Sequence, residues 1–168
     1  MLKRVEKQSP ASFRDFVESL VWSAYDQDGL AQVKFSEVND SGDLYEIEIQ
    51  MNDKGCYLPL SRLVISIEDF EGGVSVVLGH RYAMDETLAI EPFTLHHRFK
   101  DQVAKHLPDC DQWLVGTDYQ VAGMTFKDFD SIDFSGFQNV VAGFAGNVLN
   151  AAQRPTSALG TMPQTPEL

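Results

Sequence analysis

Residues 55–79 read GCYLPLSRLVISIEDFEGGVSVVLG, and this stretch indicates the fold class more clearly than any other part of the chain. Within it Leu63, Ile65 and Ile67 recur at every second position, which is the period of a strand with one buried face. A turn at 71–73 then leads into a second alternating run at 74–78. The stretch therefore predicts antiparallel strands joined by a glycine turn.

The same alternation continues towards the N-terminus. Val33 and Phe35 alternate with polar residues, and a longer alternating run at 45–51 follows the turn sequence NDSGD. These two segments predict an antiparallel hairpin, and with the strands that follow they form a meander of four or five strands. One face of the hairpin is expected to be buried, while the other, which carries Glu46 and Glu48, is expected to be wet and acidic.

Helical periodicity appears before, between and after the strand segments. We expect Ser9 to cap the first helix, with Pro10 at its first position and an end near Gly29. A second helix follows Pro92, because apolar residues then fall four positions apart, at Leu95, Phe99, Val103 and Leu107. Short strands at 113–115 and 119–126 precede a last helix, which begins at a cap on Asp133 or Ser135 and ends near Gln153.

These segments predict an α+β fold. We expect an antiparallel sheet of about five to six strands, flanked by an N-terminal helix, a middle helix and a long C-terminal helix. The length of 168 residues fits a single domain, which we place at 9–152. The ends are expected to be a flexible N-terminus at 1–8 and a flexible, proline-containing tail at 153–168.

Composition narrows the functional classes. The formal net charge of −12 repels phosphate backbones, so we expect no direct binding to nucleic acid. Each apolar run is interrupted early, which argues against a membrane span. The cysteines Cys56 and Cys110 form no CxxC pattern and no apolar leader follows the charged start, so a cytoplasmic protein with reduced thiols is expected.

No motif points to catalysis, to a metal or to a cofactor. The histidines His80, His96, His97 and His106 lack the spacing of a zinc site, and we expect them to be surface or half-buried side chains. Asp128, Asp130 and Asp133 resemble the start of a calcium loop, but no glycine stands at its sixth position. We therefore predict no enzyme, although a dispersed active site stays a third hypothesis.

The last predicted helix carries small residues that lower helix stability, so close approach of another backbone must compensate for them. Packing within the domain is one explanation. The other is a homodimer seam in which two copies of this helix meet at Gly143, Phe144 and Gly146.

The stretch at 55–79, the helix after Pro92 and the segment MTFKDFDSIDFSGFQNVVAGFAGNVL at 124–149 together resemble the small, acidic type III secretion chaperones in size, acidity and order of elements. The resemblance implies a homodimer that holds an extended effector segment on exposed apolar patches and strand edges, without ATP. Trp22 lies off the main stripe of the first helix and is either a core residue or an exposed anchor for such a segment.

Our first functional hypothesis is accordingly a chaperone or adaptor that binds a partner polypeptide without catalysis. The alternative is an acidic immunity or inhibitor protein that neutralises a basic toxin or nuclease. The candidate partner-binding residues are Trp22, Glu46, Glu48, Asp128 and Asp130.

Overall fold

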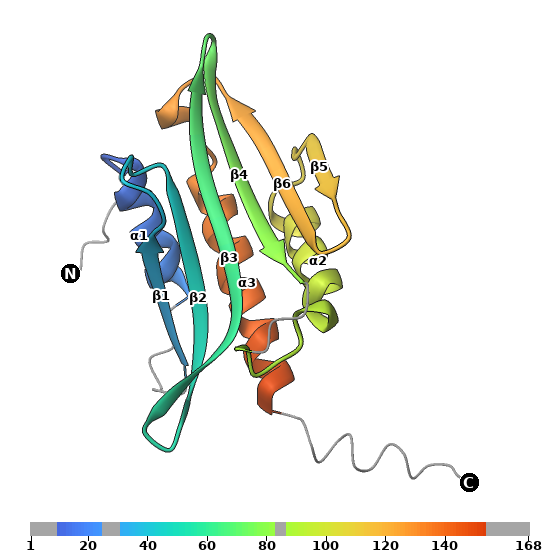
Figure 1. The fold of residues 1–168 in the computed structure, drawn as a ribbon. Coiled ribbons are helices and arrows are strands. Elements are labelled where there is room, and N and C mark those ends of the chain that lie inside the picture. Colours follow the sequence, from blue (N-terminus) through green and yellow to red (C-terminus); the bar gives the residue numbers. More distant parts are fainter. Residues whose placement is uncertain (1–9, 25–30, 83–86, 154–168) are drawn as a thin grey trace, which may run out of the picture.

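The computed structural model describes residues 10–24, 31–82 and 87–153, which form an antiparallel six-stranded sheet with helices on one face (Figure 1). The strands are β1 (Ala31–Glu37), β2 (Leu44–Asp53), β3 (Cys56–Phe70), β4 (Gly73–Arg81), β5 (Gln112–Val115) and β6 (Tyr119–Phe126). Their order across the sheet is β1-β2-β3-β4-β6-β5. The predicted α+β class and its sheet of five to six strands are confirmed.

The first four strands form the predicted meander, since β1, β2, β3 and β4 pair in sequence order. Gly42 and Gly72 take positive φ values of 76° and 104° in two of its turns, a region that costs glycine little. β3 continues through Pro59 because this residue lies beyond the end of β4, where β3 has a neighbour on one side only. The register shifts between Ile49 and Gln50 of β2, near the same point.

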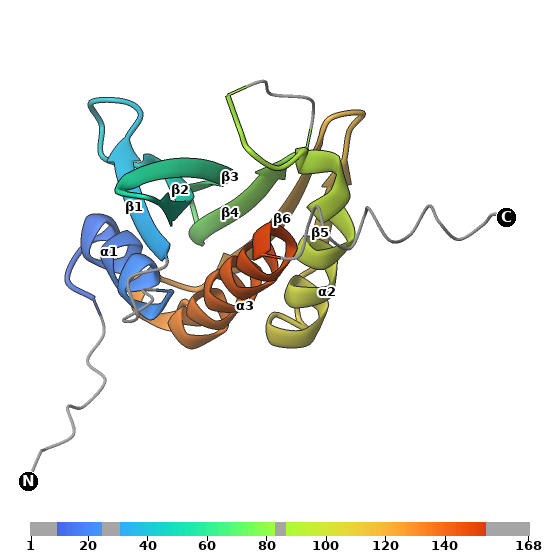
Figure 2. The ribbon, with the colours of Figure 1, turned by 90° about the horizontal axis from the view of Figure 1, so that it is seen from below.

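The helices are α1 (Phe13–Ser23), α2 (His96–His106) and α3 (Phe134–Gln153), and they lie side by side on one face with α3 in the middle (Figure 2). Short 3-10 turns, η1 (Pro92–Leu95) and η2 (Phe129–Ser131), precede α2 and α3. We call the opposite, uncovered side of the sheet the open face. No helix among the described residues combines the length and the apolar character that a membrane crossing requires.

The predicted start of the first helix is wrong. Ser12, not Ser9, is the N-cap: its hydroxyl accepts a hydrogen bond from the Asp15 N–H at 3.1 Å. The Ser12 carbonyl accepts from the Phe16 N–H at 3.0 Å, so the backbone ladder begins there and Pro10 precedes the helix. Ser9 and the expected end at Gly29 lie outside the described residues.

The other helix boundaries follow the sequence closely. α2 and α3 end at His106 and Gln153. Of the alternative caps of α3, Asp133 is the one used, since its carboxylate accepts from the Gly136 N–H at 3.0 Å. The predicted N-terminal segment 1–8 lies outside the described residues, as does 154–168 of the predicted tail at 153–168. The first residue of that tail, Gln153, is instead the last residue of α3.

The core lies between the helices and the covered face of the sheet. Phe16 of α1 and Phe137 of α3 are fully buried, and their ring centroids stand 5.7 Å apart in an edge-on contact. Ile47 and Leu63 close the core from the sheet side, and both are fully buried. Burial of each such side chain contributes about 1.5–3 kcal/mol.

Candidate functional site

A groove of about 410 Å³ opens between α1 and β1, which is an edge strand of the sheet. Trp22 of α1 stands in its wall and is 65% exposed, more than any other large apolar side chain in the described residues. The sequence left open whether Trp22 is a core residue or an exposed anchor, and the structure shows that this side chain is exposed. The lining consists of Glu18, Val21, Trp22, Gln32, Val33, Lys34 and Phe35.

Local periodicity explains why Trp22 faces outward. The buried stripe of α1 consists of Phe13, Phe16, Val17 and Leu20, and Trp22 falls two residues after its last member, on another side of the helix. On β1 the groove is floored by Val33, which is buried, and Phe35, which is half-buried. The Arg14 guanidinium carbon stands 5.2 Å from the Phe35 ring centroid, so a cation covers one side of this ring.

The groove combines an apolar floor, a charged rim and a free strand edge. β1 pairs with β2 alone, so its outer backbone N–H and C=O groups have no strand beside them in the described part of the chain. Lys34 and Glu18 supply a cation and an anion at the rim. An extended peptide could add to this edge and place alternate side chains in the groove, which is the geometry of β-augmentation.

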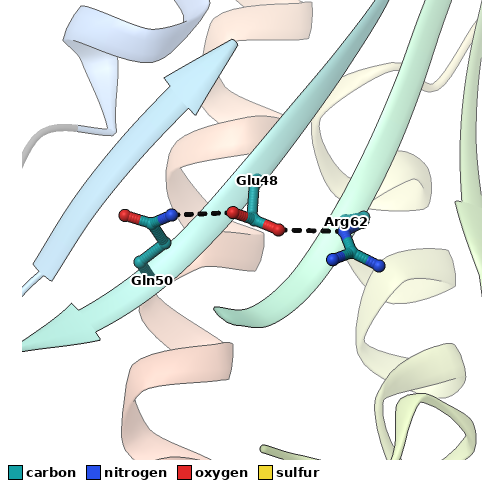
Figure 3. Close-up of polar contacts among 3 residues, drawn as sticks. All are labelled: Glu48, Gln50 and Arg62. Carbon is teal, nitrogen blue, oxygen red and sulfur yellow. Dashed lines mark hydrogen bonds and ion pairs between the residues drawn. The ribbon is translucent and has the colours of Figure 1, made fainter. Parts of the chain in front are cut away.

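Glu46 and Glu48 lie on the open face of β2, opposite the buried Ile47, as the alternation predicted, but they are less exposed than a free acidic face would be. Both are half-buried, and the Glu48 side chain is 24% exposed. Figure 3 shows why: the Glu48 carboxylate accepts from the Arg62 Nε at 2.9 Å and from the Gln50 amide at 2.7 Å. Gln32 of β1 donates in turn to Gln50 at 3.1 Å, so a polar network crosses three strands.

The candidate pair Asp128 and Asp130 lies elsewhere, where the chain leaves β6 for α3. Asp128 caps η2, accepting from the Ser131 N–H at 3.0 Å and from the Ser131 hydroxyl at 2.8 Å. Asp130 is exposed. Two of the four candidate carboxylates, Glu48 and Asp128, thus have hydrogen-bond partners within the protein. The glutamates lie on β2 and the aspartates lie between β6 and α3, so the four residues form no single site.

The α3 residues predicted for a dimer seam divide into two groups. Phe144 is fully buried, and its ring lies 5.0 Å from the His80 ring and 5.8 Å from the Phe99 ring. A Cβ on Gly143 would overlap the Gln102 carboxamide of α2. Both therefore serve packing inside the domain, the first of our two explanations, whereas Gly146 is exposed with nothing near its missing Cβ.

In the described part of the chain, the histidines, cysteines and carboxylates are dispersed over several elements. Among the described residues no group of three histidines, cysteines or carboxylates could hold a metal ion. His97 is exposed and His96 and His106 are half-buried as expected, but His80 is 1% exposed, which corrects our prediction for this residue. Burial raises the pKa of the Cys110 thiol, which lowers the fraction of nucleophilic thiolate.

The open face carries a further hollow that the sequence did not indicate. This groove of about 450 Å³ lies over β3, β4 and β6, and Arg81 and Asp118 form a loose ion pair of 3.7 Å in its wall. Its apolar lining comes from Val64, Gly79 and Val121. The sequence shows the alternation in β3, β4 and β6, but it does not show that outward-facing apolar residues of these three strands lie next to one another.

Comparison with known proteins gives no family for the chain. No protein-family model matches it, and no curated protein matches its sequence.

Proposed function

We propose that this protein is a non-catalytic chaperone or adaptor that holds an extended segment of a partner polypeptide in the groove between α1 and β1. The observation that carries the proposal is the position of Trp22, a large apolar side chain that is 65% exposed beside the edge strand β1. Exposed tryptophans in pockets are typical anchors of protein interfaces.

The chemistry of the groove defines the partner segment. Because β1 offers a strand edge, the segment binds in an extended conformation and its alternate side chains face the groove. The side chains that meet Val21, Val33 and Phe35 are apolar. Those on the other side of the added strand pass Lys34 and are polar or acidic.

The order of elements supports the same proposal. A helix, four strands, a helix, two strands and a long C-terminal helix follow one another, which is the order on which the resemblance to type III secretion chaperones rests. The family membership itself is part of the proposal, as is a cytoplasmic location. Partner binding on an exposed apolar patch and a strand edge is what that resemblance implies.

The proposal includes a homodimer, and β5 is the element best suited to form it. β5 is the other edge of the sheet, and Leu114 and Val115 are 59% and 53% exposed. Its sequence QWLV contains none of the charges or prolines that commonly protect strand edges. Antiparallel pairing of two β5 strands across a two-fold axis would continue the sheet into the second copy and leave the α1–β1 groove accessible.

Differential capture from the native host tests the partner site. Tagged wild-type protein, Trp22→Ala and Phe70→Ala are compared by mass spectrometry of the retained polypeptides. Phe70 is the matched control, because it is 47% exposed but lies at the end of β3, away from the groove. We expect one set of polypeptides to be lost in Trp22→Ala and kept in Phe70→Ala, with retention that survives higher salt.

Two results would contradict the proposal. If Trp22→Ala retains what the wild type retains, the groove is not the binding site. If retention disappears as ionic strength rises, charge dominates the association, as expected for the inhibitor hypothesis. That hypothesis gains no support from Glu48 or Asp128, whose carboxylates already bind Arg62 and Ser131.

A further inference from the structure

His80 occupies an unusual position in the core. It points from β4 into the space beneath α2 and α3, where its ring lies 5.7 Å from the Phe99 ring and 5.0 Å from the Phe144 ring. The side chain is 1% exposed, and neither ring nitrogen has a hydrogen-bond partner among the described residues. A buried imidazole without partners is held in its neutral form, because protonation would place an uncompensated charge in an apolar space.

Among the described residues, His96 is the only charged group that contributes to the pKa of His80, and it lowers this pKa. Of the elements packed around it, α3 carries no ionisable side chain at all. Tyr82, the residue after β4, lies 6.1 Å away between ring centroids. β3 places Leu63 opposite His80, and β6 places Gln120 opposite it. The ionisable group of α2 that acts on His80 is His96. A positive charge on His96 repels a protonated His80 and lowers its pKa. No carboxylate faces the ring from these elements.

The same layer of the core holds most of the unpartnered buried polar atoms. Five of the six such side-chain atoms in the described residues belong to His80, Gln102, Trp113 and Gln120, and the sixth belongs to Ser61. Gln102 lies on α2, while Gln120 and Trp113 lie on β6 and β5. Unsatisfied buried polar atoms cost stability, so this cluster disfavours the closed contact between α2 and this end of the sheet.

We propose that His80 is an acid-sensitive latch for α2: its neutral imidazole lets α2 pack on the sheet, and its protonation releases α2 from β5 and β6 while the β1–β4 meander stays folded. The inference is independent of the partner-binding proposal, because His80 does not line the α1–β1 groove.

The pH range follows from the direction of the pKa shift. Burial, with a smaller contribution from His96, lowers the pKa of His80 from 6.5 to about 4. The open state therefore binds more protons than the closed state between these values, and closure weakens as the pH falls from 6.5 towards 4. The difference corresponds to an increase of up to about 300-fold in the opening equilibrium constant, with each pKa unit counting tenfold.

Trp113 provides a local probe of this opening. Its ring stacks on Phe99 of α2 with centroids 6.1 Å apart. The chain has one other tryptophan, Trp22, so replacing Trp22 leaves Trp113 as the single tryptophan emitter. In full-length Trp22→Phe protein, we expect Trp113 emission to shift to the red with a midpoint between pH 6.5 and 4. Far-UV circular dichroism should change far less over the same range, because the meander stays folded.

Matched variants assign the transition to His80. His80→Phe and His80→Leu should abolish it, whereas His97→Gln, which changes an exposed histidine of α2, should leave its midpoint unaltered. An unchanged transition in either His80 variant overturns the proposal, as does simultaneous loss of emission and circular dichroism signals, which indicates global unfolding.

A measurement on the unsubstituted protein keeps the test decisive if both His80 variants fail to fold. Histidine ring resonances are followed by NMR from pH 8 to pH 4. We expect the His80 resonance to titrate well below the ordinary histidine pKa of about 6.5 and together with changes in α2 resonances. A His80 ring that titrates near 6.5 while α2 resonances stay unchanged refutes the latch.

Discussion

Two glycines of α3 that the sequence does not distinguish should respond differently to the same substitution. Gly146 is exposed, has no positive φ, and nothing lies within 4 Å of the position of an added Cβ. Alanine exceeds glycine in helix propensity by about 1 kcal/mol, so Gly146→Ala should stabilise the protein by about that amount. For a chain of this size the melting temperature should rise by about 2–4 °C.

Gly143→Ala gains the same propensity but loses packing. Its Cβ would overlap the Gln102 carboxamide, whose oxygen is buried, so the glutamine must move or α2 must shift away from α3. Because the carboxamide is the far end of a flexible side chain, its displacement costs little, and Gly143→Ala should stabilise the protein by less than Gly146→Ala does. Shortening the neighbour should relieve the overlap, so Gly143→Ala should stabilise the protein more in a Gln102→Ala background.

Urea unfolding followed by circular dichroism measures both variants, and light scattering gives their masses. A smaller stabilisation by Gly143→Ala than by Gly146→Ala, at unchanged mass, is expected. If Gly146→Ala destabilises the protein and lowers its mass, two copies of α3 meet at Gly146, and the seam predicted from sequence is right. If both glycines respond with equal stabilisation, the close approach of α2 at Gly143 is refuted.

Two further substitutions test the sheet. A Cβ on Gly73 would overlap the Phe126 backbone carbonyl, which cannot move aside as a flexible side chain does. Gly73→Ala should therefore lower the free energy of unfolding in urea by about 1–3 kcal/mol. An unchanged unfolding midpoint would argue against so close an approach of β4 to the end of β6. Leu114→Lys places a charge on the β5 edge, and in light scattering it should halve the mass without altering circular dichroism; a monomeric wild-type protein would exclude the proposed dimer.

Much of the fold could be read from local patterns because those patterns reflect burial of one face. Alternation at Leu63, Ile65 and Ile67 predicted a strand, and all but Ile67 are fully buried in β3. The four-residue spacing of Leu95, Phe99, Val103 and Leu107 predicted the middle helix, which packs through these residues. Glycines with positive φ mark turns at positions 42 and 72, as the sequence indicated.

The candidate site depended on contacts between distant segments. The sequence placed Glu48 on an acidic sheet face, but the pairing of β2 with β3 places Arg62 opposite it, and the two side chains form an ion pair. The sequence does not distinguish His80 from the other histidines, but in the folded protein it is covered by Phe99 of α2 and Phe144 of α3. Periodicity cannot reveal such encounters, because it describes one element and not its neighbours.

The amino-acid sequence by itself determined which segments become strands and helices, since these depend on neighbouring residues, on caps and on turn glycines. It also determined the strongly acidic net charge. Only the tertiary structure decided which side chains stay exposed or lose their water. Those outcomes depend on strand order and helix placement, which bring together residues as far apart as Trp22 and Phe35, Glu48 and Arg62, or His80 and Phe144.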